Sequence, residues 1–317
     1  MAVVNLTPDS FSGDGFLGAS RKPARPEDSG CGHRRHWVDA AVGHALHAAR
    51  LGAAWIDLGA ESSRPGALPL SEAEEIARLR PVLKTLAEER ARSRRAPPGI
   101  DFRISVDTMK PAVMELALHE GADMLNDVNA FRALGAWQVA VQAPRICIVH
   151  MLGSPQTMQE SPDYPDMQGG VLGAVRRFLA GRIEEARQRG VDPARIVVDP
   201  GIGFGKTLHH NLCLLRSVAA IQRPQDSVPD EAYPVLIGVS RKRMIGEITG
   251  KPVHQRCAGS IGAAIAAVEA GASFLRVHDV GETIDALRVY SACRSKPGHT
   301  PVAEEVRASR GRNPVLN

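Results

Sequence analysis

Two cationic side chains near the end of the chain are spaced so that they share one face of a strand. Arg276 and His278 lie two residues apart in the run Phe274-Leu-Arg-Val-His-Asp-Val280, which predicts a strand, so both side chains project to the same side. A guanidinium beside an imidazole at the end of a strand is suited to hold a phosphate group. A structural ion pair with a buried carboxylate such as Asp279 is the alternative explanation.

Other polar side chains recur at the ends of β-rich runs. They are Asn5, Asp57, Asp107, Asn126, Asp127, His150, Asp199, Ser240 and Lys242. Any single one could cap a following helix, because Asp, Asn and Ser side chains accept hydrogen bonds from the first backbone N–H groups. Capping does not explain the whole set, which therefore predicts a polar site where the strands end.

The run Asp199-Pro-Gly-Ile-Gly-Phe-Gly-Lys-Thr207 ends like a phosphate-binding P-loop. The spacing argues against that interpretation, because the first glycine of a P-loop would fall on Pro200, which has no N–H for a phosphate. The glycines instead predict tight backbone turns beside a flat ligand.

A cluster of Cys31, His33 and His36 has the residue types of a metal site but no fourth ligand in view. It lies among arginines in a Gly/Pro-rich stretch, which favours a solvated loop. The five cysteines are scattered without a CxxC pair, so they predict neither a disulfide framework nor a zinc site. We expect reduced thiols.

The elements that position these residues follow a strand–helix alternation. Expected strands span 2–5, 55–59, 104–108, 124–128, 146–151, 196–201, 235–240 and 274–280. Helical spacing of apolar residues lies between them, at 38–51, 72–86, 113–119, 171–189 and 261–270. Eight such units predict an α/β fold, a (β/α)8 TIM barrel in a single domain. A doubly wound open sheet also alternates but rarely needs eight units.

The barrel is expected to span residues 1–293. Two stretches of the chain do not follow the strand–helix alternation. Residues 13–37 are rich in Gly, Pro and Arg and predict a long loop. Residues 294–317 predict a basic, flexible tail.

The composition narrows the class of protein. The 317 residues are 44% hydrophobic and 23% charged, and the net charge of +4 suits anionic small substrates rather than nucleic acid. No stretch of about 18 apolar residues predicts a membrane span, and no signal peptide is expected. We expect a cytoplasmic protein.

Taken together, the motifs resemble those of the dihydropteroate synthase family. The resemblance is carried by Asn5-Leu-Thr-Pro-Asp-Ser-Phe-Ser12, Asp57-Leu-Gly-Ala-Glu-Ser-Ser-Arg-Pro-Gly-Ala67, Ile104-Ser-Val-Asp-Thr108, Leu125-Asn-Asp-Val128, His150-Met151, Asp199 to Thr207, Gly238-Val-Ser-Arg-Lys242 and Arg276-Val-His-Asp279. They follow the family's order along almost the whole chain. The resemblance implies that p-aminobenzoate is condensed with hydroxymethyl-dihydropterin pyrophosphate.

The resemblance also implies the site residues. The catalytic group would be Asp107, Lys242, Arg276 and His278. The pterin would be bound by Asp107, Asn126, Met151, Asp199, Phe204 and Lys242, and the pyrophosphate by Asn5, Ser63, Arg64, Arg276 and His278. The p-aminobenzoate contacts would be Phe11, Ser63, Pro65, Phe204, Lys242 and Arg243. Mg²⁺ would be the cofactor, with Asn5 and Asp14 as metal candidates. Sulfonamides would be inhibitors, and the chain would form a homodimer.

By this resemblance the reaction is SN1-like. Asp107 would stabilise positive charge on the pterin methylene, while Mg²⁺ and the cations would stabilise the departing pyrophosphate. The arylamine is unprotonated at neutral pH, so no dedicated general base is required.

Three positions depart from the family pattern. The loop carboxylate, Asp14, stands one place later than usual, Ser63 replaces a threonine, and Arg243 replaces a serine. Two alternatives keep the barrel but change the function, namely the pterin-binding domain of a corrinoid methyltransferase and a non-catalytic pterin-binding module. The first does not explain the Thr-Pro-Asp-Ser-Phe loop or Ser-Arg-Lys, and the second would need a broken reactive set.

Overall fold

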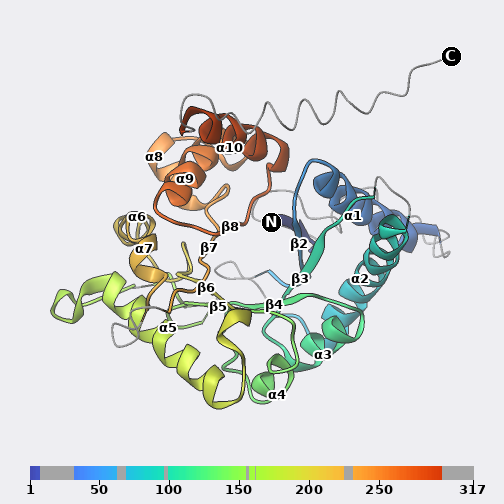
Figure 1. Ribbon diagram of the computed structural model, residues 1–317, viewed down its shortest axis with the longest axis horizontal. Helices are drawn as coiled ribbons and strands as arrows, with labels where there is room; N and C mark the ends of the chain where they lie inside the picture. Colours follow the sequence, from blue (N-terminus) through green and yellow to red (C-terminus); the bar gives the residue numbers. More distant parts are fainter. Residues whose placement is uncertain are drawn as a thin grey trace.

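The computed structural model describes residues 1–7, 32–62, 69–95, 99–154, 157–160, 162–224 and 231–294. Strands and helices alternate through these ranges, with the helices arranged around the strands (Figure 1). The strands are β1 (Ala2–Asn5), β2 (Trp55–Gly59), β3 (Arg103–Asp107), β4 (Met124–Asp127), β5 (Ile146–Val149), β6 (Ile196–Asp199), β7 (Leu236–Ile237) and β8 (Phe274–Leu275).

The strands form a parallel ring. Strands β1 to β6 make one sheet in sequence order, and β7 pairs with β8. Two single bridges connect the sheets, Val198 with Val235 and Ala2 with Val277, and the second is held by a 3.0 Å hydrogen bond from Val3 N to the Val277 carbonyl. The chain therefore folds as the expected (β/α)8 barrel, although β7 and β8 are shorter than the sequence predicts.

The helices cover the outside of the ring. They are α1 (Gly32–Arg50), α2 (Glu72–Arg94), α3 (Pro111–His119), α4 (Ala136–Ala140), α5 (Gly170–Gln188), α6 (Leu208–Arg216), α7 (Val218–Ile221), α8 (Arg243–Thr249), α9 (Cys257–Glu269) and α10 (Val280–Arg294). Helix α1 begins at Gly32, inside the stretch 13–37 that the sequence predicts as a loop. Its first turn is polar and carries no apolar periodicity, so the pattern there does not reveal a helix.

Local sequence explains several of the helix boundaries. Ser71 begins α2 with a capping box, in which its side chain accepts from Glu74 N and the Glu74 carboxylate accepts from Ser71 N. Thr207 begins α6 in the same manner with His210. Pro111 occupies the first turn of α3, where its missing N–H costs no hydrogen bond.

Two layers of apolar side chains hold the barrel together. The larger layer lies between strands and helices and includes the fully buried Ile56, Leu83, Ile104 and Leu125. A smaller cluster includes Met124, Cys147 and Val197, together with Trp55 at the start of β2. The Trp55 ring meets Phe274 edge-on, with centroids 6.0 Å apart. Burying each large aliphatic chain contributes about 1.5–3 kcal/mol, so the polar residues at the opposite strand ends rest on a rigid support.

Among the described residues, no helix has both the length and the apolar character needed to cross a membrane.

Candidate active site at the mouth of the barrel

A half-buried arginine bridges two carboxylates where the strands end. Arg276, directly after β8, donates from Nε to Asp57 Oδ2 at 2.6 Å and from Nη2 to Asp107 Oδ2 at 3.2 Å. Asp57 is fully buried, whereas the side chains of Arg276 and Asp107 remain 22% and 24% exposed. Asp57 Oδ1 is buried and has no hydrogen-bond partner among the described residues. The cluster is thus anchored at its base and open at its top.

Strand register explains why these residues meet. Asn5 lies opposite Gly59, Gly59 opposite Asp107, and Asp107 opposite Asn126, so three polar side chains stand at one level of the ring. Asp57 precedes Gly59 by two residues and lies on the same face one layer deeper. A Cβ at Gly59 would lie in ordinary contact with the Asp107 side chain, 3.7 Å from its Cβ, so the glycine keeps that position beside Asp107 unfilled.

Asp107 combines burial with a high density of negative charge. Burial raises the pKa of Asp107 to about 7, with Arg276 opposing the rise and Asp57 adding to it. A carboxyl that changes charge near neutral pH at a strand end has the properties of a functional group.

Asn126 and Asp199 supply acceptors beside Asp107. Asn126 is 5% exposed, and its Oδ1 is buried without a partner among the described residues. Asp199 Oδ1 accepts from Gly201 N at 2.6 Å, and burial raises the pKa of the Asp199 carboxyl while Lys242 opposes the rise. An unpartnered buried oxygen is costly, so the Asn126 amide indicates a place for a ligand N–H group.

Asp127 is structural. Its two carboxylate oxygens accept from Asn129 N at 2.7 Å and Phe131 N at 2.6 Å, which fixes the turn after β4. Asp127 therefore serves the backbone, but it closes a turn and caps no helix, since the next helix, α4, begins at Ala136 after Gly135.

Lys242 reaches the mouth from a strained turn. The preceding residue, Arg241, has a φ of 57°, and it is held by Arg241 N donating to Ser260 Oγ at 2.8 Å and by an ion pair with Asp279. Lys242 Nζ donates to the Ile202 carbonyl and lies 4.6 Å from the centroid of the Phe204 ring. Burial lowers the pKa of Lys242 to about 8, although Asp199 opposes the fall. Asp279 thus pairs with Arg241, and not with Arg276.

The glycine run after β6 makes the predicted tight turns. Gly201, Gly203 and Gly205 have φ values of +67°, +82° and +65°. A Cβ on Gly201 would lie 1.8 Å from the His150 carbonyl oxygen, so only glycine fits. The buried Lys206 Nζ donates to the Phe204 carbonyl at 3.0 Å and lies 2.9 Å from His150 Nδ1. Lys206 therefore braces the turn that presents Phe204 instead of meeting a nucleotide.

The remaining described candidates differ in position. His278 Nδ1 lies 3.0 Å from Ser240 Oγ, which also accepts from His278 N at 3.2 Å. Met151 is buried in the smaller apolar cluster, the one that includes Met124 and Cys147, and Phe204 packs against that cluster. Arg243 is peripheral, because its side chain is 80% exposed and forms an ion pair with Glu247 at 2.6 Å.

Five predicted residues lie outside the described ranges. They are Phe11, Asp14, Ser63, Arg64 and Pro65. Within the described ranges, no group of three or more His, Cys, Asp or Glu side chains could hold a metal ion.

The sequence predicts Asp57 at the strand ends but not among the site residues, although it is the closer partner of Arg276. The sequence contains one signal for this role. Asp57 begins the run Asp57-Leu-Gly-Ala-Glu, at the same end of the barrel as Arg276 and His278, whose positive charge requires an acidic partner. In the sequence Lys206 belongs only to the run that resembles a P-loop, and its bracing role depends on the fold.

Comparison with known proteins agrees with this geometry. The family model described as pterin binding enzyme matches residues 25–278. The dihydropteroate synthase of Neisseria meningitidis serogroup C is 41% identical over 296 residues, which cover 92% of this chain and 91% of that protein.

Two solved structures are similar in fold and sequence. The dihydropteroate synthase of Yersinia pestis, solved with a sulfonamide drug complex, has a TM-score of 0.78 and 36% identity, covering 93% of this chain and 94% of that one. The enzyme of Xanthomonas albilineans, solved with 4-aminobenzoic acid, has a TM-score of 0.75 and 38% identity, covering 94% and 93%.

Proposed function

Because this chain belongs to the dihydropteroate synthase family of pterin-binding enzymes, we propose that the polar residues at its barrel mouth carry out the family's reaction. As a dihydropteroate synthase, the protein condenses p-aminobenzoate with hydroxymethyl-dihydropterin pyrophosphate, and it releases dihydropteroate and pyrophosphate. The observation that carries the assignment of residues is the Arg276 bridge between Asp57 and Asp107, beside the unpartnered oxygen of Asn126.

The pterin is bound by the acceptors and the lysine at the mouth. Asp107, Asn126 and Asp199 offer oxygens to the ring N–H groups, and Lys242 offers a donor to the pterin carbonyl. Phe204 and Met151 supply apolar surface for a flat ring. Support comes from the common level of Asp107 and Asn126 and from the short distance between Lys242 and the Phe204 ring.

Arg276 links binding of the pyrophosphate to the state of Asp107. In the free protein the guanidinium holds the Asp107 carboxylate, and an arriving pyrophosphate competes for the same Nη2 group. Asp107 then loses part of its pairing when positive charge develops on the pterin methylene, so its carboxylate stabilises that charge. His278, Asn5, Ser63 and Arg64 complete the anion site in this proposal.

Mg²⁺ fits as an ion that arrives with the substrate. Magnesium in proteins is often held by one or two protein oxygens together with substrate phosphates, so Asn5 at the end of β1 can serve without a preformed cage. Asp14 is a second candidate ligand. When bound, the ion would neutralise charge on the leaving pyrophosphate.

The amine substrate is proposed to enter above the pterin. Phe11, Ser63 and Pro65 would contact p-aminobenzoate, together with Lys242 and Phe204 from the barrel. Arg243, at the outer edge, would meet the carboxylate or a sulfonamide inhibitor. The similar Xanthomonas albilineans protein was solved with 4-aminobenzoic acid and the Yersinia pestis protein with a sulfonamide, which supports both ligand classes.

The test is direct formation of dihydropteroate from the two substrates, with and without Mg²⁺. We expect product from the pterin pyrophosphate and none from the pterin alcohol, which lacks the leaving group. Binding of the pterin without product formation would instead support a non-catalytic binding module.

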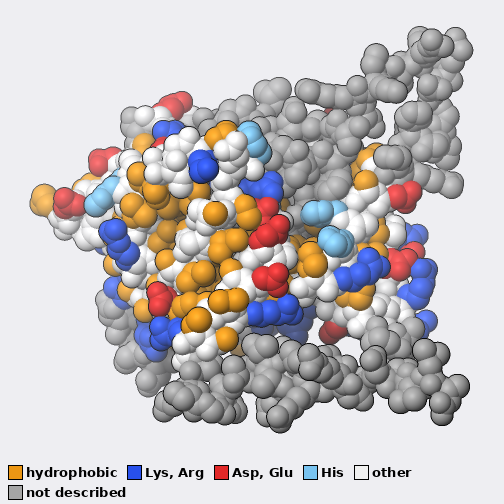
Figure 2. Space-filling view, turned by 90° about the horizontal axis from the view of Figure 1, so that it is seen from above, with side chains coloured by type: hydrophobic (Ala, Val, Ile, Leu, Met, Phe, Trp, Pro, Cys, Tyr) orange, Lys and Arg blue, Asp and Glu red, His pale blue; other side chains and the backbone are white. Residues whose placement is uncertain are grey.

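We also propose a homodimer that forms through α6, α8 and α9. A groove of about 530 Å³ lies there between small residues such as Gly262 and Ala266 and apolar ones such as Leu212, Leu215 and Ile248. Figure 2 shows hydrophobic side chains gathered on the face that carries α8 and α9. Light scattering of wild type and of Ala266→Arg should separate a dimer from a monomer.

A cytoplasmic location is proposed as well. The cysteines of the described ranges, Cys147, Cys213, Cys257 and Cys293, are free thiols, which suits a reducing compartment.

A further inference from the structure

The turn that carries Lys242 is held by an arginine that follows it in the chain. Arg256 lies between the short helix η4 (Val253–Gln255) and α9. Its Nη1 donates to the Arg241 carbonyl at 3.1 Å and to the Lys242 carbonyl at 3.4 Å. Its Nε donates to the Lys251 carbonyl at 2.9 Å. One guanidinium therefore joins the backbone just before α8 to the backbone just after it.

Helix α8 leaves room for this guanidinium. It spans only Arg243–Thr249, and α9 lies beside it (Figure 1). A Cβ on Gly246, in the middle of α8, would lie 2.2 Å from Arg256 Nη2, so any side chain there would displace the guanidinium. A Cβ on Gly259 would lie 2.6 Å from Ile245 Cγ2, so the second glycine lets the two helices approach closely.

The turn needs this support because its backbone is strained. Arg241 has a φ of 57°, a left-handed conformation that costs free energy for a residue other than glycine. Arg241 N donates to Ser260 Oγ at 2.8 Å, and the same hydroxyl donates to the Arg256 carbonyl at 2.6 Å. The Arg241 side chain pairs with Asp279. Since the dihedral angles of Arg241 set the direction of the next residue, relaxation of the turn would point Lys242 away from the mouth.

The position of Lys242 Nζ determines both its contacts and its charge. Nζ donates to the Ile202 carbonyl in the turn after β6. Burial lowers the pKa of Lys242 to about 8, and Arg276 adds to the fall, whereas Asp199 and Asp107 oppose it. A lysine that left the mouth for solvent would lose the burial, and its pKa would rise toward the ordinary value of 10.5.

We propose that Arg256 is a positioning residue, which fixes the backbone of Arg241 and Lys242 and thereby directs Lys242 Nζ into the barrel mouth. This inference rests on the proposed function, in which Lys242 donates to the pterin carbonyl. A donor that is held in place before the ligand arrives has less freedom to lose on binding.

Two substitutions and one matched control test the role of the guanidinium. Arg256→Met keeps an apolar side chain but removes every donor, whereas Arg256→Lys keeps one charged donor that cannot bond the backbone at both ends of α8. Arg195→Met is the control. Arg195 Nη2 donates to the Val141 carbonyl at 2.8 Å and to the Ala143 carbonyl, at the start of β6 and so at the opposite end of the barrel. A role in stability alone would give the two methionine variants the same behaviour at Lys242.

The first measurement is independent of catalysis. Acetylation of Lys242 by acetic anhydride, quantified by mass spectrometry from pH 6 to pH 11, reports the pKa of this amine, because only the neutral form reacts. We expect a midpoint near 8 in wild type and in Arg195→Met. In Arg256→Met the midpoint should rise by about one to two pH units, and in Arg256→Lys by a smaller amount.

The second measurement is kcat/KM for the pterin pyrophosphate, with p-aminobenzoate and Mg²⁺ saturating. Arg256→Met should lower it about tenfold, which corresponds to a weakened charge-assisted contact, and Arg256→Lys should recover part of the loss. The alkaline limb of its pH profile should move upward together with the acetylation midpoint. Arg195→Met should stay within about twofold of wild type.

An Arg256→Met variant whose midpoint and kcat/KM match those of Arg195→Met would overturn the inference and leave the proposed function intact. If Arg256→Met does not fold, the same comparison with Arg256→Lys decides. Wild-type protein that forms no dihydropteroate would overturn the proposed function, and the acetylation midpoints alone would then decide whether Arg256 positions Lys242.

Discussion

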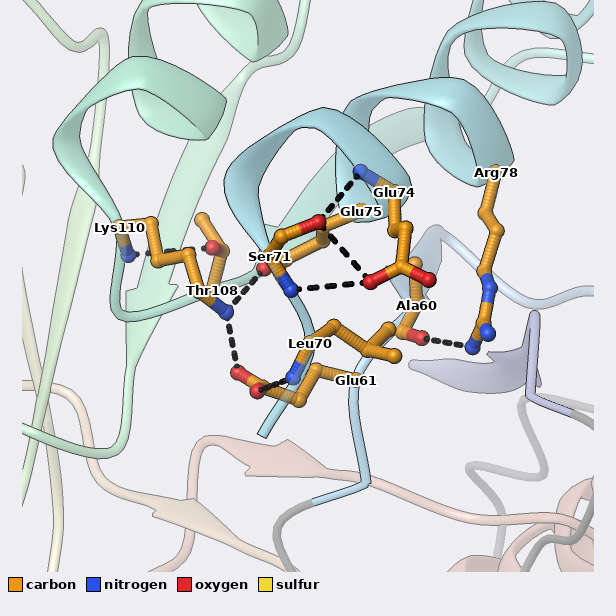
Figure 3. A network of polar contacts seen from close by, with 9 residues as sticks. All are labelled: Ala60, Glu61, Leu70, Ser71, Glu74, Glu75, Arg78, Thr108 and Lys110. Carbon is orange, nitrogen blue, oxygen red and sulfur yellow. Dashed lines mark hydrogen bonds and ion pairs between the residues drawn. The ribbon is translucent and has the colours of Figure 1, made fainter. Parts of the chain in front are cut away.

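Two clusters in the described part of the chain share one arrangement of charges, a cation between two carboxylates. Arg276 lies between Asp57 and Asp107 inside the barrel mouth, and Lys110 lies between Glu61 and Glu75 outside it (Figure 3). The cations are similarly covered, with side chains 22% and 19% exposed. Burial and charge alone therefore do not distinguish a reacting group from a structural one.

The difference lies in what else the carboxylates contact. In the outer cluster, the second oxygen of Glu61 accepts a backbone N–H, so the pair holds the chain. Each cluster also has one buried oxygen without a partner among the described residues, Asp57 Oδ1 and Glu75 Oε1, so the contrast rests on Asp107, which is the most exposed of the four acids. A charged cluster acts on the backbone when its second oxygen accepts a backbone N–H, and can act on a ligand when one of its carboxylates stays exposed at the mouth.

The largest expected effect follows from removing the charge of Asp107. Asp107→Asn should lower turnover by about a hundredfold or more, because the amide cannot stabilise the developing cation. The fold should persist, since Arg276 keeps Asp57. The measurement is kcat together with the melting temperature, with Asp101→Asn, an exposed acid just before β3, as the control. Near-normal turnover in the folded variant would remove the functional contrast between the two clusters.

Loss of the inner cation should separate two pterin ligands. Arg276→Ala should weaken binding of the pterin pyrophosphate by about tenfold to a hundredfold, which corresponds to a charge-assisted contact, and binding of the pterin alcohol by about threefold or less. Calorimetric titration measures both affinities. Equal losses for both ligands in Arg276→Ala would place the guanidinium on the pterin.

Loss of the outer cation should change stability and not ligand preference. Lys110→Met should lower the free energy of unfolding by about 3 kcal/mol, because it leaves two buried carboxylates unpaired. The ratio of the affinities for the pterin pyrophosphate and the pterin alcohol should stay unchanged.

The ionisation of Asp107 in the inner cluster, and of the neighbouring Lys242, should determine how kcat/KM depends on pH. Asp107 must be ionised to act, and its pKa of about 7 means that kcat/KM falls as the pH drops below 7. Lys242 must be protonated to donate, and its pKa of about 8 means that kcat/KM falls as the pH rises above 8. Because kcat/KM reports the free enzyme, a narrow bell is expected. Glu61→Gln should keep both limbs, whereas a flat profile from about pH 6 to 9 would exclude the two groups.

Much of the barrel could be predicted from the chain, because buried strands such as Ile196–Asp199 are short apolar runs that end in a polar residue. The closure of the ring was harder to predict. Strand β8 pairs over only two residues, and its contact with β1 is a single bridge, although the run around it reads as a longer strand. Helices α6 and α8 are short and lack a long apolar period, so the pattern did not mark them.

For the site, residue types at strand ends predicted which side chains meet at the mouth. The pairing within that set depends on strand register and on layers of the barrel. Asp279 is three residues from Arg276 in the chain, yet the partners of Arg276 are Asp57 and Asp107, which are 219 and 169 residues away. The tertiary structure determines which carboxylates pair with Arg276. The outer cluster escaped prediction for the same reason, since Glu61 and Lys110 are 49 residues apart.

The smallest expected effect concerns Arg243, which lies beyond both clusters. Its side chain is 80% exposed and already pairs with Glu247, and surface ion pairs contribute about 0–1 kcal/mol. Arg243→Ser should therefore change the KM for p-aminobenzoate and the inhibition constant of a sulfonamide by about threefold or less, and leave the KM for the pterin pyrophosphate unchanged. Steady-state kinetics at low and high salt provide the measurement, because water and ions screen an exposed guanidinium and the effect should shrink as salt increases. Lys251→Ser, an exposed cation just after α8, is the control. If Arg243→Ser moved the p-aminobenzoate constant by more than tenfold, or moved the pterin constant instead, the exposed guanidinium would have to turn inward on binding. The contrast between a charge held inside the mouth and one left in solvent would then no longer apply to the bound enzyme.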